Sequence, residues 1–263
     1  MSKIIRYELY KFFTAKKIYV LCFITVALAF LISFTVKVVN TMGDVNQRIN
    51  VNAQGFPLYF SLEYAGQIMP ILCVILFGGL ISDEYRDGTL KLALLRPYKR
   101  HEVLWAKIFV MFVGVVILLI VAFVSSYPGG LTFLEWGNSF LMDQLSFDYS
   151  GFQGIATTLL AYTYTIFPML AFSLLVLLLS ILIDNSGVTI GIGIGVHFLL
   201  TILSDYISGI EFLFVNSYYI YGIHFFMHQP AIEWVTAAAS IAGYIGLSVL
   251  AATKFFAKKD ILS

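Results

Sequence analysis

Charged residues are scarce in this 263-residue chain: Asp, Glu, Lys and Arg make up 12% of it. Soluble domains carry about twice that share, roughly 25%. Hydrophobic residues make up 60%, and the mean hydropathy is +0.89. Several apolar runs reach the roughly 20 residues that a helix needs to cross a hydrocarbon core about 30 Å thick. The composition therefore excludes an ordinary soluble domain and predicts a polytopic membrane protein, organised as one domain over residues 1–263.

The chain also lacks several sequence motifs that point to a chemical activity. It has two cysteines, Cys22 and Cys73, in the first and second apolar runs, and we interpret both as small buried hydrophobes. No Gly-rich loop followed by Lys-Ser or Lys-Thr is present, so the chain cannot bind ATP in the P-loop manner. The N-terminus does not have the pattern of a cleavable signal peptide. We predict that the chain is not an enzyme, binds no cofactor or metal and has no nucleic-acid partner.

The histidines give no strong site. His224 and His228 are four residues apart, but no Cys or carboxylate at matching spacing completes a metal site. We interpret them as interfacial polar residues. His197 lies inside the fifth apolar run, and a neutral ring hydrogen-bonded to a neighbouring helix is favoured over a proton relay.

Six apolar segments are predicted to cross the membrane as helices: residues 18–36, 56–81, 103–124, 155–183, 187–203 and 235–256. Apolar residues recur at helical spacing in residues 3–17, and mostly basic residues occupy the positions between them. This pattern predicts an amphipathic helix lying at the membrane–water interface. Residues 41–54 are predicted to form an exposed loop, and Tyr127-Pro128-Gly129-Gly130 to begin another. The aromatic-rich segment 205–233 predicts short interfacial or re-entrant helices at the outer surface.

The Lys and Arg residues predict the orientation of these spans. With both termini inside, fourteen of the sixteen fall on the inner side, and Lys37 and Arg48 fall in outer loops. Such an excess is the positive-inside signature. We therefore predict a multi-pass protein of a bacterial cell membrane with both termini cytoplasmic.

The inner loop between the second and third spans is the most distinctive stretch. Residues 83–107 carry six of the sixteen Lys and Arg residues. Gly88 is predicted to break the preceding helix, residues 90–95 to form a short amphipathic helix, and Pro97 to stop it. A charged loop that only sets topology is the simpler alternative from charge alone.

The spacing in this loop resembles the cytoplasmic loop of type-2 ABC exporter permeases. The matching residues, in order, are Glu84, Gly88, Thr89, Leu90, Leu94, Leu95, Pro97, Arg100 and Lys107. In that family the segment is a coupling helix that docks onto a separate ATP-binding subunit. The resemblance implies an N-terminal elbow helix, short extracellular helices before span six, and a permease that pairs with an identical or paralogous one.

Two further sets of residues are singled out by spacing. Polar residues that share helix faces in the second and fourth spans are candidates to line a pathway or a helix contact: Glu63, Gln67, Thr158, Tyr162 and Thr165. Pro70 is expected to kink the second span. Gly187, Gly191 and Gly195 recur every four residues, which predicts close helix packing, with an intramolecular contact favoured over a dimer seam.

The resemblance implies the permease subunit of an ATP-driven exporter, with ATP and Mg bound by the partner subunit. The substrate expected is an amphipathic or hydrophobic molecule, a peptide or a drug. The alternatives are an ATP-independent transporter or channel, and an intramembrane enzyme acting on lipids.

Overall fold

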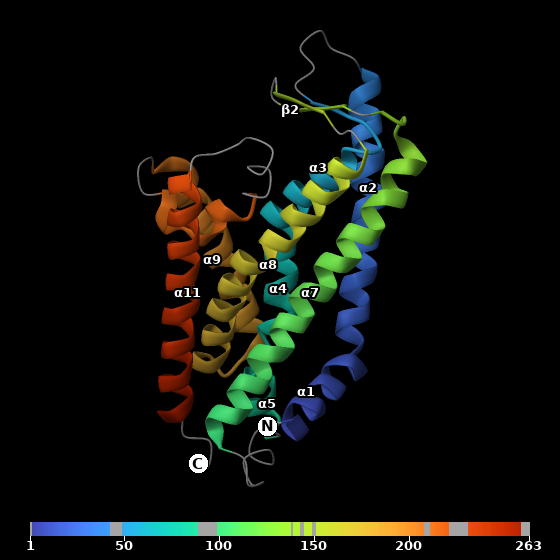
Figure 1. The fold of residues 1–263 in the computed structure, drawn as a ribbon. Helices are drawn as coiled ribbons and strands as arrows, with labels where there is room; N and C mark the ends of the chain where they lie inside the picture. Colours follow the sequence, from blue (N-terminus) through green and yellow to red (C-terminus); the bar gives the residue numbers. More distant parts are fainter. Residues whose placement is uncertain are drawn as a thin grey trace.

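A computed structural model of the protein describes residues 2–42, 49–88, 99–137, 139–142, 145–148, 151–207, 211–220 and 231–258. The chain forms a helical bundle with a small sheet at one end (Figure 1). The long helices are α1 (Ser2–Thr14), α2 (Lys16–Met42), α7 (Arg100–Phe133), α8 (Gly151–Leu182), α9 (Ser186–Tyr206) and α11 (Ala231–Lys258). The shorter helices are α3 (Phe56–Glu63), the π-helix η1 (Tyr64–Ile68), α4 (Met69–Phe77), α5 (Ser82–Arg86) and the 3₁₀ turns η2 (Glu211–Leu213) and η3 (Val215–Tyr218).

Within the described residues, six helical stretches are long and apolar enough to cross a membrane. They are Lys16–Thr41, Phe56–Arg86, Arg100–Phe133, Gly154–Leu182, Ser186–Ser204 and Ile232–Lys258. The predicted polytopic, helical membrane protein is confirmed at this level. The N-terminal segment is also helical, as α1, and the aromatic-rich segment contains η2 and η3 before the last span.

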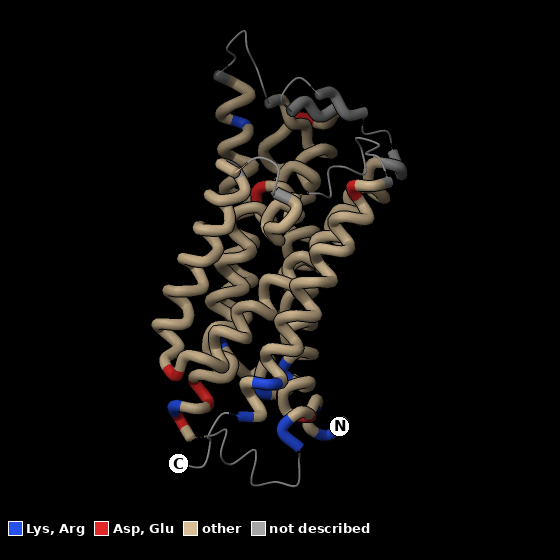
Figure 2. The backbone as a smooth tube through the Cα atoms, turned by 90° about the vertical axis from the view of Figure 1, so that its left-hand side faces the viewer, with Lys and Arg blue, Asp and Glu red and all other residues tan. Residues whose placement is uncertain are grey.

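The two ends of the bundle differ in charge. We call the end that holds α1, α5, the start of α7 and the end of α11 the basic end (Figure 1). Every described Lys and Arg except Lys37 lies at this end, and the blue segments of Figure 2 gather there. The opposite end carries the sheet and is called the sheet end. This is the charge asymmetry on which the predicted orientation depends.

The helix α7 does not end where the sequence suggested. The loop predicted from Tyr127 onward is wrong, because α7 continues through Pro128 to Phe133. Proline removes one backbone donor and crowds the preceding turn, yet the helix is held by its neighbours. The Ser33 hydroxyl of α2 donates to the Gly129 carbonyl at 2.7 Å. A Cβ at Gly129 would lie 3.1 Å from the Ala29 carbonyl oxygen, so the glycine allows α7 to approach α2.

The prediction of plain loops at the sheet end is also wrong. There β1 (Ile49–Val51), β2 (Ser139–Met142) and β3 (Leu145–Asp148) form an antiparallel sheet in the order β1-β2-β3. The Asn40 amide of α2 donates to the Val51 carbonyl at 3.0 Å. Backbone pairing therefore joins two connections that lie about ninety positions apart in the sequence.

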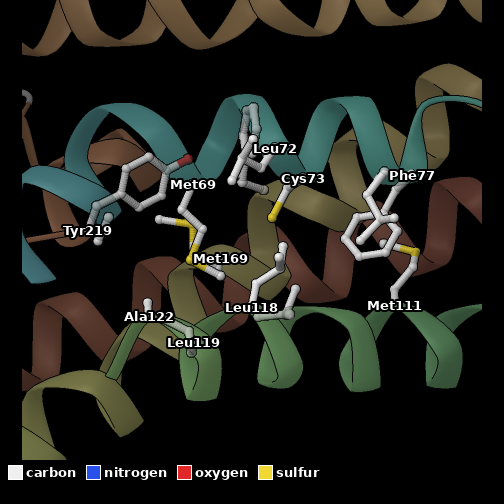
Figure 3. Close-up of a cluster of buried hydrophobic side chains, with 14 of the residues drawn as sticks. Met69, Leu72, Cys73, Phe77, Met111, Leu118, Leu119, Ala122, Met169 and Tyr219 are labelled. Carbon is white, nitrogen blue, oxygen red and sulfur yellow. The ribbon is translucent and has the colours of Figure 1, made fainter. Parts of the chain in front are cut away.

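The second span is the centre of the bundle. In its most apolar window 67% of the residues are buried inside the chain, against 28% in the first span and 17% in the fifth. Figure 3 shows Phe77 and Cys73 of α4 beside Met111 and Leu118 of α7, and Met69 beside Met169 of α8. The second span therefore contacts several other helices of the chain.

A π-helical turn interrupts this central span. η1 lies directly before Met69 and Pro70, where we predicted a kink. Such turns have one extra residue, and many of them occur at functional sites. The turn is tied to α2, because the hydroxyls of Tyr64 and Thr25 lie 3.0 Å apart.

Candidate functional site

The clearest concentration of buried charge lies at the basic end. Glu8 and Lys11 of α1, Glu84 of α5 and Lys107 of α7 form one network of ion pairs, which we call the charge cluster. It joins three helices that are far apart in the sequence. Two carboxylates face two ammonium groups, so the cluster carries no net charge.

Lys107 is the centre of the cluster. Its side chain is 1% exposed, and its Nζ lies 2.6 Å from Glu84 Oε2 and 3.4 Å from Glu8 Oε2. The same Nζ donates to the Leu80 carbonyl oxygen at 3.2 Å. An ammonium group has three donors, so all three of the Lys107 donors have acceptors.

Glu84 is held from both sides. One carboxylate oxygen pairs with Lys107, and the other accepts from the Lys11 ammonium. Burial by itself would lower the pKa of Lys11, but the carboxylates of Glu84 and Glu8 outweigh that effect and hold the pKa above its ordinary value. Lys11 therefore stays protonated at neutral pH and keeps Glu84 paired.

The local sequence explains how these groups meet. Glu8 and Lys11 are three residues apart in α1, so they share a helix face with the buried Ile4 and Phe12. A cavity of about 160 Å³ borders the cluster, between α1, the start of α2 and the end of the second span. Glu84 and Lys107 lie on the two helices that flank residues 89–98. The cluster thus connects the helices on both sides of that segment to the N-terminal helix.

The short helix α5 is fixed at both of its ends. The Ser180 hydroxyl of α8 accepts hydrogen bonds from the backbone N–H groups of Ile81 and Ser82, at 3.0 and 3.1 Å. At the other end Gly88 has a φ of 69°. Side chains disfavour this left-handed conformation, whereas glycine adopts it freely. The prediction that Gly88 ends the helix after the second span is confirmed.

Arg100 connects the start of α7 to the last helix. Its guanidinium donates to the Ala257 carbonyl of α11 at 3.1 Å. Glu84, on the other side of residues 89–98, pairs with α1 and α7. Both residues therefore connect the helices that flank residues 89–98 to the rest of the bundle.

Several predicted residues lie outside the described part of the chain. In the resemblance to the coupling helix these are Thr89, Leu90, Leu94, Leu95 and Pro97. The histidines His224 and His228 also fall outside it.

The polar residues proposed to line a pathway do not form one surface. Glu63 and Gln67 are exposed on the outside of the chain. Thr158, Tyr162 and Thr165 are buried, because α8 packs inside the bundle. The Tyr162 hydroxyl donates to the Pro57 carbonyl at 3.1 Å, which makes it a contact between α8 and α3.

The glycine repeat of α9 faces outward. Gly187, Gly191 and Gly195 are exposed, and a Cβ at Gly191 or Gly195 would meet nothing within 4 Å among the described residues. The close approach occurs instead at Gly193, where a Cβ would lie 2.8 Å from the Val74 side chain of α4. The intramolecular contact that we favoured is therefore absent from the described part of the chain, and the dimer seam is the alternative that was given with it.

His197 is fully buried, and neither ring nitrogen has a hydrogen-bond partner among the described residues. The ring lies against Phe172 and Tyr219, with centroid distances of 5.8 and 6.3 Å. The hydrogen bond that we predicted to a neighbouring helix is not present there.

Sequence reasoning missed Glu8 and Lys11 as partners of the cluster. Both were assigned to the polar face of an amphipathic helix. The available signal was the pairing of an acid and a base three residues apart beside buried apolar residues, but their partners on α5 and α7 are set by tertiary packing.

Comparison with known proteins gives two matches. A segment of 67 residues is 30% identical to "Uncharacterized protein YhcI" of Bacillus subtilis (strain 168). The match covers 26% of this chain and spans about a fifth (21%) of that relative. Residues 44–262 match the family described as "Protein of unknown function (DUF2705)". Since that match covers most of the chain, the protein belongs to this family.

Proposed function

We propose that the chain is the membrane-spanning permease subunit of a type-2 ABC exporter. The observation that carries the proposal is the charge cluster, which includes one residue from each of the helices that flank residues 89–98. The sequence of that segment has the spacing of a coupling helix, and the flanking helices α5 and α7 are joined to α1 by buried ion pairs. Six apolar stretches among the described residues and a sequence without a P-loop suit a permease that depends on a separate ATPase.

On this proposal the segment between Gly88 and Lys99 docks onto the ATP-binding subunit. When ATP drives the two ATP-binding subunits together, each one displaces its coupling segment. The helices on the two sides of the segment, α5 and α7, would move together, because Lys107 is paired with both Glu84 and Glu8. The displacement therefore moves α5, α7 and α1 as one unit and changes the packing of the central second span.

The N-terminal helix takes the role of the elbow. One face of α1 buries Ile4 and Phe12, while Tyr7, Tyr10 and Phe13 are exposed. Aromatic side chains are favoured at the membrane interface, so this helix would lie in the inner interface and carry the motion of the cluster to α2.

A second permease, identical or paralogous, completes the translocation pathway between the two chains. The outward faces of α2, α9 and α11 are apolar and little buried. They are available to lipid or to the second permease. The substrate expected is an amphipathic or hydrophobic molecule.

The experiment is to co-purify the tagged chain from its own cells and to measure ATP hydrolysis by the complex. We expect a P-loop ATPase to be recovered in stoichiometric amount. Leu94→Asp places a charge on the apolar side of residues 90–95, the segment proposed to dock. It should lower the recovery of the ATPase at least tenfold while membrane insertion is unchanged. A matched control, Ala257→Asp at an exposed position at the basic end of α11, should still recover the ATPase. Equal recovery with Leu94→Asp and with the wild type would contradict the coupling role.

A further inference from the structure

The sheet-end half of the first and second spans encloses a groove of about 210 Å³. One wall is a stripe of α2, and the other is the end of α3. The lining residues are Ile32, Thr35, Val36, Val39, Tyr59 and Glu63. The groove is therefore apolar along α2 and has a single ionisable carboxyl group, that of Glu63.

Glu63 lies in the sheet-end third of the second span. It is seven residues after the first residue of α3, which corresponds to about 10 Å along a helix with a 1.5 Å rise. A carboxylate beside the apolar side chains of α2 is stabilised when a cation or water faces it. Among the described residues no Lys or Arg pairs with Glu63, and Lys37 of α2 is not part of the lining.

The backbone at Glu63 is irregular as well. Glu63 is the residue directly before the π-helical turn η1. Tyr59, one turn earlier, lines the same groove and brings its hydroxyl close to the Glu63 carboxyl group. A neutral hydroxyl does not balance a negative charge, so the carboxylate still attracts a cation.

We propose that this groove binds the ammonium group of an amphiphilic organic cation. The carboxylate of Glu63 pairs with the cation, and the α2 stripe contacts the first carbon atoms next to it. The volume is below the roughly 300–1,000 Å³ of sites that enclose a drug-sized ligand. The groove therefore holds a head group, and the rest of the molecule extends along the lipid-facing surface. As a statement about exported substrate this inference rests on the proposed function; as a statement about binding it does not.

The test uses the purified full-length chain in phosphatidylglycerol nanodiscs, a lipid without an amine, with empty nanodiscs as the blank. Three probes share one skeleton and differ in charge: phenylbutylammonium, phenylbutanol and phenylbutyrate. Ligand-observed NMR gives the affinity of each. We expect the ammonium to bind about tenfold more tightly than the alcohol, because a charge pair forms in a partly solvated site. Phenylbutyrate should show no binding above the blank.

Three variants separate charge from shape. Glu63→Gln should bring the ammonium to the affinity of the alcohol. Val39→Trp fills the groove without a change of charge and should remove the binding of both. Glu135→Gln changes an exposed acid at the sheet end outside the groove and should bind as the wild type does. Equal affinity for ammonium and alcohol in the wild type, or equal losses in Glu63→Gln and Glu135→Gln, would overturn the assignment.

A repeat in phosphatidylethanolamine nanodiscs distinguishes a mobile cation from a lipid head group. If the lipid amine occupies the groove, wild-type binding of the probe disappears there, and the assignment to a mobile amphiphile is wrong. Persistence of the binding supports it. No ATPase subunit is present in these measurements, so failure to recover an ATPase refutes the exporter while leaving the cation site. Wild-type affinity in Glu63→Gln refutes the site while leaving the exporter.

Discussion

Replacement of Lys107 by Met is the sharpest probe of the charge cluster. Methionine is unbranched and of similar length, so it keeps much of the packing of the lysine stem and removes the ammonium. Glu84 would keep Lys11 as a partner, but Glu8 would lose the ion pair at 3.4 Å. Breaking a buried ion pair by removal of one partner costs about 3–5 kcal/mol, because the other charge stays buried and uncompensated. We expect Lys107→Met to lower the free energy of unfolding by that amount.

The assay is SDS-induced unfolding of the purified chain in mixed micelles, followed by circular dichroism. A double-mutant cycle with Glu84→Gln isolates the pair. Residues in direct contact usually show coupling energies of about 0.5–3 kcal/mol, so the double variant should lose less than the sum of the single losses. Lys254→Met, at an exposed position of α11, is the matched control and should change stability by no more than about 0.5 kcal/mol.

Two outcomes would refute the reasoning. Additive losses in the cycle would mean that Lys107 and Glu84 do not interact in the folded protein. A loss in Lys107→Met as small as that in Lys254→Met would mean that Lys107 is solvated and not buried. Either result would also remove the main support for a rigid link between α1, α5 and α7.

The remaining predictions concern the end of α5 and the orientation of the chain. Gly88→Ala forces a side chain into a left-handed conformation and should cost about 1–2 kcal/mol in the same unfolding assay, while Gly88→Asn should cost less; equal values would show that the left-handed conformation is not retained. In an otherwise cysteine-free chain, Trp136→Cys should react with an impermeant maleimide from outside intact cells and Lys99→Cys should not, because they lie at opposite ends of the bundle. The reverse labelling would overturn the predicted topology.

The spans were predictable because their cause is local. A helix must cross about 30 Å of hydrocarbon with every backbone group hydrogen-bonded, so run length and polarity identify it. The end of α7 was not predictable in this way. A Tyr-Pro-Gly-Gly sequence ends most helices, and here the approach of α2 at Ala29 and Ser33 keeps it helical. The strands were missed because each has three or four residues and pairs with a distant segment.

The candidate site was predictable in part for the same reason. Glu84 and Lys107 were selected because they belong to one pattern of spacing within a single loop. Glu8 and Lys11 were not, because a charged face on an amphipathic helix is expected to face water or lipid head groups. Their burial depends on where α1 docks, which no local pattern determines. The outward position of Gly187, Gly191 and Gly195 has the same origin, since Gly193 lies where α9 meets α4.

The two sites lie at opposite ends of one span, and this has a mechanical consequence for the proposed function. Residues Phe56–Arg86 form a single central stretch, with Glu84 near one end and Glu63 near the other. Ion pairs between buried groups are often no more stabilising than apolar contacts, but they require a defined geometry. On the proposed function, a displacement at α5 would therefore be passed along the span to α4. Along this span the regular α-helical hydrogen-bonding pattern changes at η1, directly after Glu63. Rearrangement of that turn would alter the groove, which would give the proposed ATPase partner a route for releasing a cation bound there.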